Sequence, residues 1–248
     1  MFPKLLHEGA ILLADSHAAS WRTPFVDFLA ALERDEIHTT QLILMGDNFD
    51  LLFGPVAQTL RDNHASIELL NRLSQKIEII YLEGNHDFRL ASLFPAIYVV
   101  DRSHQPLILS FKEERIALLH GDMKVPFGYA LYTNLIRNRP ILFCLNVINE
   151  VFNGIIINTL SKQMQRKNHC KKIENFEAIA KRHLGTSWAH KCDVIIEGHY
   201  HQNCTFELDG MKYYNLGAFA CNERYYVVKS SQDRTIILDE AIFHKEPR

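Results

Sequence analysis

Five short apolar runs, each followed by a cluster of polar residues, constrain the fold of this chain more than any other feature. The runs are rich in Ile, Leu and Val, which is typical of strands buried on both faces. The runs and their polar clusters are residues 11–14 with 15–17, 42–45 with 46–50, 79–82 with 84–87, 116–119 with 120–122, and 194–196 with 198–201. This repetition predicts a sheet protein whose polar residues gather at the strand ends.

Two segments between the first three runs have helical character. Residues 21–34 and 57–73 carry apolar side chains at a spacing of three and four, as amphipathic helices do. Strand and helix in alternation predict an α/β fold. Further strands with turns between them are expected at residues 205–208, 212–216, 225–229 and 235–238. We therefore predict one domain over residues 1–248, with mixed sheets flanked by helices.

Composition restricts the function classes. The formal net charge is −2, so a dedicated nucleic-acid binder is not expected. The five cysteines are odd in number and form no C-x-x-C pair, which favours a reducing, cytoplasmic setting. The apolar run at residues 11–14 is too short for the hydrophobic part of a signal peptide.

The polar clusters have the composition of a metal site. In α/β sheets a ligand binds beyond the carboxyl ends of the strands, and all five clusters follow a predicted strand. They supply carboxylate, imidazole and amide groups, which bind hard or borderline divalent cations. Asp15 and His17 are two residues apart, as are His199 and His201, so in extended chain each pair would point the same way. Five unrelated turns would not all present such ligands, and we predict a divalent metal site.

The motifs also resemble a known family. Asp15-x-His17, Gly46-Asp47-x-x-Asp50, Gly84-Asn85-His86-Asp87, His120-Gly121-Asp122 and Gly198-His199-x-His201 are similar to the motif series of the calcineurin-like metallophosphoesterases. The resemblance implies a four-layer α/β sandwich and a hydrolase with two divalent metal ions. Manganese is the expected metal, with iron, zinc or cobalt as alternatives.

The same resemblance implies roles for the site residues. One metal ion would be held by Asp15, His17, Asp47 and His201, and the other by Asp47, Asn85, His120 and His199. Asp47 would bridge the two ions, which together clamp a displacement at phosphorus. His86 would assist as donor or general acid, and Asp50, or less plausibly Asp87, would orient it. Surface or packing roles are expected for most of His7, His38, His64, His104, His169, His183, His190 and His244.

A long insertion separates the fourth and fifth units. We predict that residues 128–190 form a helical cap on the same domain, with an amphipathic helix over residues 140–160. Between Arg137 and Arg182 the sequence has nine Lys and Arg residues and three Glu residues, which gives a local charge of +6. An apolar helix with cationic flanks suits a membrane surface or an amphiphilic anionic ligand. The alternative is that the apolar face packs on the core.

A metallophosphoesterase core with such a cap resembles the UDP-2,3-diacylglucosamine pyrophosphatases of lipid A biosynthesis. This resemblance implies cleavage of the substrate to UMP and diacylglucosamine 1-phosphate, by a protein that can lie peripherally on the inner face of the cell membrane. The cap would form a chamber for the acyl chains. Candidate substrate contacts are Tyr129, Ile141, Leu145, Ile148, Phe152, Lys167, Lys171 and Lys172.

Two other functions remain open. His86 stands where that subfamily typically has Arg, which favours a phosphatase or phosphodiesterase acting on a nucleotide or a phosphoprotein. A non-catalytic scaffold of the same fold is the third candidate. Scaffold versions are expected to have lost metal ligands, whereas every expected ligand type is present here.

Overall fold

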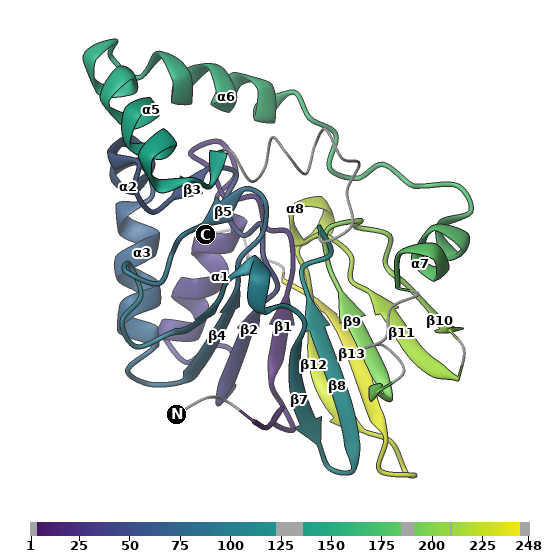
Figure 1. The fold of residues 1–248 in the computed structure, drawn as a ribbon. Coiled ribbons are helices and arrows are strands. Elements are labelled where there is room, and N and C mark those ends of the chain that lie inside the picture. The colour runs from purple at the N-terminus through teal and green to yellow at the C-terminus, as the bar shows by residue number, and fades with distance from the viewer. Residues whose placement is uncertain (1–3, 123–135, 185–190, 209, 244–248) are drawn as a thin grey trace.

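The computed structural model describes residues 4–122, 136–184, 191–208 and 210–243. Two sheets stack face to face, with helices on their outer faces (Figure 1). The six-stranded sheet has the order β13-β12-β1-β2-β4-β6 and the five-stranded sheet the order β10-β11-β9-β8-β7. The strands of the first are β1 (Ile11–Leu13), β2 (Gln41–Leu44), β4 (Glu78–Leu82), β6 (Tyr98–Val100), β12 (Arg224–Ser230) and β13 (Ile236–Ile242). Those of the second are β7 (Leu107–Phe111), β8 (Glu114–Leu119), β9 (Val194–Glu197), β10 (Cys204–Leu208) and β11 (Met211–Asn215).

The five predicted strands are divided between the two sheets. β1, β2 and β4 are neighbours and run parallel in one sheet, and β8 and β9 are parallel neighbours in the other. Their carboxyl ends therefore lie on one edge of the sandwich, because the polar residues that follow them contact one another across the two sheets. Mixed pairing is also as predicted, since β12 is antiparallel to both of its neighbours.

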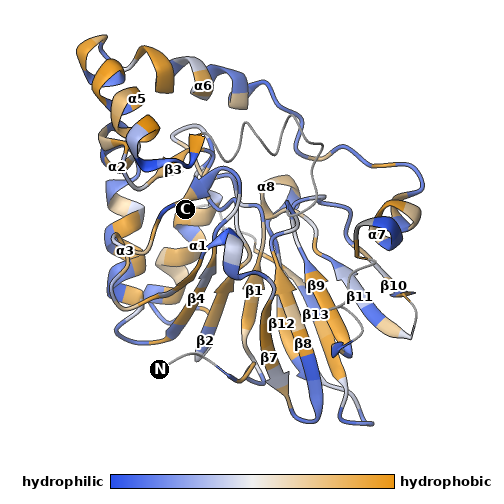
Figure 2. Ribbon diagram, viewed as in Figure 1, coloured by the Kyte–Doolittle hydropathy of each residue, from blue (hydrophilic) through white to orange (hydrophobic). Residues whose placement is uncertain are grey.

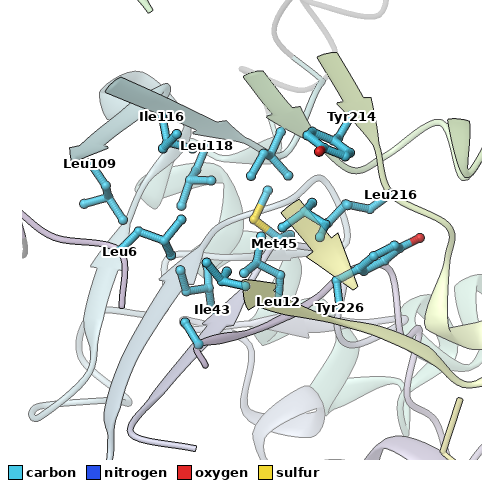
Figure 3. Packing of buried hydrophobic residues seen from close by; sticks show 14 of the residues in the cluster. Leu6, Leu12, Ile43, Met45, Leu109, Ile116, Leu118, Tyr214, Leu216 and Tyr226 are labelled. Atoms are coloured by element: carbon cyan, nitrogen blue, oxygen red, sulfur yellow. The ribbon is translucent and has the colours of Figure 1, made fainter. Parts of the chain in front are cut away.

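The core between the sheets follows from alternation along the strands. Leu12 and Ile43 point to the opposing sheet and pack with Leu118 (Figure 3), whereas Ile11 and Leu13 point to the outer face and pack with helices. Successive side chains of a strand face opposite sides of its sheet. Strands covered on both faces must be apolar at every position, and this explains the continuous runs in the sequence.

Helices cover both outer faces, and this completes the four layers. α1 (Pro24–Glu33) and α3 (His64–Leu73) pack on the six-stranded sheet. α7 (Phe176–Leu184) packs on the five-stranded sheet through Phe176 and Ala180. α7 lies inside the range 128–190 predicted as a cap, yet it belongs to the outer layer of the sandwich. The predicted four-layer α/β fold class is confirmed.

The helix predicted over residues 140–160 is wrong as a single element. It is divided into α5 (Arg139–Val151) and α6 (Ile155–Gln165), bent by 96°. Asn153 and Gly154 have φ of 51° and 81°, and this left-handed conformation ends a right-handed helix. Within the described residues no single helix is long and apolar enough to cross a membrane; the bent pair passes that test only jointly, by length and composition.

Other local predictions also needed correction. The helix predicted at residues 57–73 breaks at Asn63 into α2 (Ala57–Asp62) and α3. The elements without a sequence prediction are β3 (Leu52–Phe53), β5 (Asp87–Phe88), β6, β7, the 3-10 turn Arg102–His104 and α8 (Phe219–Asn222). Cys170 and Cys221 form a disulfide, although the cysteine pattern predicted reduced thiols. Spacing in sequence could not reveal this pair, because the two residues are brought together only by the fold.

Candidate active site

The strand-end clusters have an unusual backbone. Five of the predicted metal ligands adopt positive φ, which is uncommon outside glycine. The φ values are 54° for Asp15, 46° for His17, 51° for Asp47, 62° for His199 and 59° for His201. The extended conformation predicted for the two pairs is therefore wrong. Left-handed residues of this kind cost free energy and concentrate at functional sites, so the local strain itself marks this edge.

Glycines next to the ligands allow close approach of the backbone. A Cβ on Gly84 would lie 2.2 Å from Asp47 Oδ1 and 2.5 Å from its backbone nitrogen. A Cβ on Gly46, whose φ is 92°, would lie 2.5 Å from His120 Nδ1. Larger residues at either position would displace a predicted ligand.

Two groups of metal-ligating atoms share Asp47. Asp15, His17 and Asp47 offer ligand atoms within 4.8 Å of one another, and Asp47, His120 and His199 do the same. His201 Nε2 lies 3.0 Å from Asp15 Oδ1, and Asn85 Oδ1 lies 3.4 Å from His120 Nε2. The structure therefore brings together all seven residues that the sequence predicted as ligands. Asp47 belongs to both groups; that it bridges two ions stays a prediction.

The buried donor atoms fit divalent cations. His17 Nε2 is buried without a hydrogen-bond partner among the described residues, and such an atom is costly to bury unless a ligand satisfies it. His120 Nδ1 contacts the carbonyl oxygen of Met45 at 3.0 Å, which leaves its Nε2 to face Asp47 Oδ2 at 3.4 Å. Backbone carbonyls commonly orient metal-binding imidazoles in this way.

Asp47 and His120 attract each other strongly when no cation is bound. Burial alone would raise the pKa of Asp47, but the neighbouring His120 outweighs burial and holds that pKa well below its usual range. Burial alone would lower the pKa of His120, and Asp47 instead raises it well above its ordinary value. A cation bound by both residues would replace the proton on His120.

The predicted contact between the Asp50 carboxylate and His86 is wrong. Asp50 Oδ1 lies 3.0 Å from His17 Nδ1, and this contact turns His17 Nε2 towards the other ligands. His86 is held instead by the backbone carbonyl of Asp50, 3.0 Å from its Nδ1. Burial raises the pKa of Asp50 to about 7. Asp50 thus acts on a predicted metal ligand, in the arrangement of a carboxylate that orients an imidazole.

Asp87, the alternative partner of His86, organises the backbone instead. Its carboxylate accepts hydrogen bonds from the amides of Asp47, Asn48 and Gly84 at 3.0, 2.7 and 2.9 Å. The hydroxyl of Tyr81 donates a further bond at 2.5 Å. These bonds connect the loop after β2 with the loop after β4, so Asp87 holds the two loops at a fixed spacing.

A mainly apolar cavity of about 530 Å³ lies beside the loop that carries Asn85 and His86. Asn85 and His86 form part of its wall on the sandwich side, and Lys167 lies at the same wall with its Nζ 3.2 Å from His86 Nε2. The apolar wall comes from the loops after β2 and β4 and from the helices α5 and α6. Its apolar residues are Leu51, Phe53, Val56, Phe88, Ile136, Leu142, Leu145, Ile156, Ile157, Leu160 and Met164.

Only some of the predicted substrate contacts reach this cavity. Leu145 and Lys167 line it. Ile148 and Phe152 are exposed on the cap, at 44% and 61% of their surface. Ile141 lies outside the lining, as do Lys171 and Lys172, which are held near Gln202. Tyr129 falls outside the described residues. The buried residues of α5 are Leu142 and Asn149, whereas Ile148 and Phe152 are turned to solvent.

His169 is a site residue that the sequence did not reveal. It was expected on the surface or in ordinary packing, yet it is buried and its ring centroid lies 3.9 Å from that of His17. No buried strand precedes His169, so the pattern that marked the other ligands is missing here. His38, His64 and His104 are exposed as predicted; His190, His244 and the side chain of His183 lie outside the described residues.

Comparison with known proteins shows which proteins the chain resembles. No family model matches the chain. The UDP-2,3-diacylglucosamine hydrolase of Proteus mirabilis is 23% identical over 229 residues, covering 90% of this chain and 95% of that protein. The protein of the same name from Psychromonas ingrahamii is 21% identical over 236 residues, covering 92% of this chain and 96% of that protein.

The chain is similar to the UDP-2,3-diacylglucosamine hydrolases. A third protein of that name, from Chromohalobacter salexigens, is 30% identical over 115 residues, covering 45% of this chain and 46% of that protein. Among solved structures, the phosphoesterase Yfce of E. coli aligns with a TM-score of 0.44 and 15% identity, over 95% of this chain and 99% of that one. The curated relatives, all named hydrolases, confirm the predicted resemblance and the predicted enzyme class, a metal-dependent phosphoesterase.

Proposed function

We propose that this protein hydrolyses the pyrophosphate bond of UDP-2,3-diacylglucosamine, releasing UMP and diacylglucosamine 1-phosphate. The observation that carries the proposal is the mainly apolar cavity whose wall includes Asn85 and His86. Its volume of about 530 Å³ lies in the usual range of roughly 300–1,000 Å³ for ligand pockets. A phosphodiesterase for polar substrates has no need of such a cavity beside its metal site. The names of the relatives in three bacterial species agree with this substrate.

The polar residues of the cavity would receive the phosphoryl group. Lys167 donates to His86 Nε2 at 3.2 Å, and burial lowers the pKa of His86, so His86 is neutral with its proton on Nδ1, facing the carbonyl of Asp50. The ammonium of Lys167 can turn from His86 to an incoming phosphate oxygen. His86 Nε2, which carries no proton in this state, can then take one from water and pass it to the leaving oxygen, which would depart protonated.

The proposed metal centre uses two divalent cations, of which manganese is the first candidate. Asp15, His17, Asp47 and His201 would hold one, and Asp47, Asn85, His120 and His199 the other. When bound, such a pair neutralises phosphoryl charge and lowers the pKa of the attacking water. Asp50 would keep His17 in position and Asp87 would keep the two loops together, so that the distance between the two groups of ligands is fixed.

We also propose that the tip of the cap contacts the cytoplasmic face of a membrane. Large apolar side chains are exposed where α5 ends and α6 begins, and Figure 2 shows α5 as strongly apolar. They are Phe143, Val147, Ile148, Val151, Phe152 and Ile155, with exposed fractions from 42% to 68%. Clustered exposed apolar residues mark interaction surfaces, and α5 and α6 also wall the proposed acyl cavity. A diacylated substrate resides in a bilayer, so a membrane contact at the cap would shorten its path to the cavity.

A comparison of three substrates tests the proposal. The manganese-loaded protein is incubated with UDP-2,3-diacylglucosamine, with UDP-glucosamine and with bis(p-nitrophenyl) phosphate, and product release is followed. Burial of six methylenes is worth about 5 kcal/mol, so kcat/KM for the diacylated substrate should exceed that for UDP-glucosamine by about 10³–10⁴-fold. UMP should be the nucleotide product. Equal values for the two UDP sugars would refute a lipid substrate and favour the general phosphodiesterase, the candidate that His86 supports.

A further inference from the structure

A third imidazole, outside the predicted ligand set, faces the metal site. His169 lies in the connection between α6 and α7 and is only 6% exposed. His17, His169 and His201 each offer a ligand atom, and the three atoms lie within 4.8 Å of one another. The ring of His169 is also stacked on that of His201, with 6.2 Å between the centroids. The insertion thereby brings a side chain to a site otherwise built by the strand ends.

The ring of His169 has no partner of its own. Neither Nδ1 nor Nε2 forms a hydrogen bond with any described residue, although both are buried. The nearest carboxylate oxygen, Asp50 Oδ1, is 3.9 Å from Nε2, which is beyond hydrogen-bond distance. A buried polar group without a partner costs about 1–3 kcal/mol. A histidine in ordinary packing would find an acceptor, whereas a ligand position leaves a nitrogen free for the cation.

The segment that carries His169 is fixed on both sides. Cys170 is bonded to Cys221 in α8, and the amides of Phe219 and Ala220 in that helix donate to the carbonyls of Ala14 and Asp15 at 2.9 and 3.2 Å. The disulfide therefore ties the segment to the loop that carries the first two predicted ligands. A ligand needs such support, because a loosely held imidazole loses conformational entropy when it binds.

A second anchor joins the same segment to His201. The carbonyl oxygen of His169 lies 2.5 Å from His201 Nδ1, and the side chain of Gln202 contacts the backbone of Lys171 and Ile173 at 3.2 and 2.8 Å. His169 thus orients His201 through its backbone while its own ring enters the site. Because only the ring is lost in His169→Ala, the variant separates a ligand role from this backbone contact.

We infer that His169 is an additional ligand of the cation held by His17 and His201. This inference rests on the metal-binding part of the proposed function and is independent of the substrate. A third imidazole makes this position richer in nitrogen than its partner around His120 and His199, which includes the amide oxygen of Asn85. Imidazole-rich sites favour zinc, iron or cobalt over magnesium and calcium. The two positions should consequently differ in affinity for the same metal.

Metal binding by His169→Ala and by the control His38→Ala tests the inference. His38 is exposed and its Nδ1 lies 2.7 Å from Asp35 Oδ1, so its loss should leave the site intact. Cobalt is titrated into metal-free protein against a competing chelator, and its visible absorption and the bound ions per chain are recorded. Loss of residues that merely orient a ligand costs about 10–100-fold in metal affinity. In His169→Ala, one of the two cobalt sites should lose at least about 10-fold in affinity, and its visible spectrum should change. Two ions should still be bound at saturation.

The melting temperature of the metal-free proteins guards against a folding artefact. His169→Ala removes an unpartnered buried group but also the packing of its ring against His17. These two effects oppose each other, so the metal-free variant and wild type should melt alike, and only the increase on adding cobalt should be smaller in the variant. Cys221→Ser should reduce cobalt affinity in the same direction by releasing the segment. An unchanged affinity and spectrum in His169→Ala, or a fall from three bound ions to two, would overturn the inference. If wild type binds no cobalt, the proposed metal centre fails as well. If wild type binds two ions and hydrolyses substrate but His169→Ala binds cobalt as wild type does, only the role of His169 fails.

Discussion

The substitution Leu145→Asn tests the acyl cavity most directly. Leu145 lines the cavity but lies outside the buried cluster formed by Leu142, Ile157, Val56 and Phe88 at the base of the cap. A polar side chain at this position should weaken acyl binding without unpacking the cap. Burial of a leucine side chain is worth about 1.5–3 kcal/mol, and tenfold in affinity corresponds to about 1.4 kcal/mol. Since Leu145 is half-buried without substrate, the lower end applies, and kcat/KM for UDP-2,3-diacylglucosamine should fall roughly tenfold.

Ile148→Asn is the matched control for this substitution. Ile148 lies one turn further along α5, is 44% exposed and does not line the cavity. In detergent-dispersed substrate, where no membrane is present, its replacement should leave kcat/KM within about twofold of wild type, because exposed positions rarely matter by more than 0.5 kcal/mol. Both variants should hydrolyse bis(p-nitrophenyl) phosphate at the wild-type rate. The reasoning fails if Leu145→Asn slows both substrates equally, or if the two variants behave alike with the lipid.

Three further predictions concern the site itself. Asp47→Ala should lose paired metal binding and turnover together, because the shared ligand disappears; elemental analysis that finds two ions per chain with normal turnover would contradict the assignment. Lys167→Met should lower turnover by roughly 10–150-fold, the value of a charged hydrogen bond of about 1.5–3 kcal/mol, with unchanged metal content and with Lys171→Met as a near-normal control. Burial raises the pKa of Glu197 to about 8. The folded state therefore retains a proton that the unfolded state releases near pH 4.5. As a result, the free energy of unfolding should fall as pH rises towards 8. In chelator-treated protein, urea unfolding of Glu197→Gln should show a flatter pH dependence than wild type between pH 5 and 8; parallel curves would mean that Glu197 is ionised in the fold.

The local sequence pattern was sufficient to predict where the buried strands end. A run such as residues 79–82 is apolar at every position because both faces of its sheet are covered, and the polar residues that follow must lie where the strand stops. For this reason the sequence alone determined the α/β class and the metal-site edge, whereas the choice of seven ligands among the clustered polar residues came from the family resemblance.

Contacts between residues far apart in the sequence were revealed only by the tertiary structure. The sequence assigned the Asp50 carboxylate to His86, but the fold turns it towards His17, because the direction of a side chain after a left-handed residue cannot be derived from spacing. It also gave one cap helix where Gly154 allows a bend, and it gave no signal for the disulfide of Cys170 with Cys221.

Amphipathic periodicity identifies an apolar face but does not say what covers that face. Leu145 lines a cavity and Ile148 is exposed, although both lie on one helix and both were predicted as substrate contacts. His169 has no strand before it and reaches His17 only because the insertion folds back over the sheet edge. Local sterics and periodicity thus determined the strands and the turns that follow them. Which side chains the cap residues contact was decided by how the cap helices pack on the sandwich.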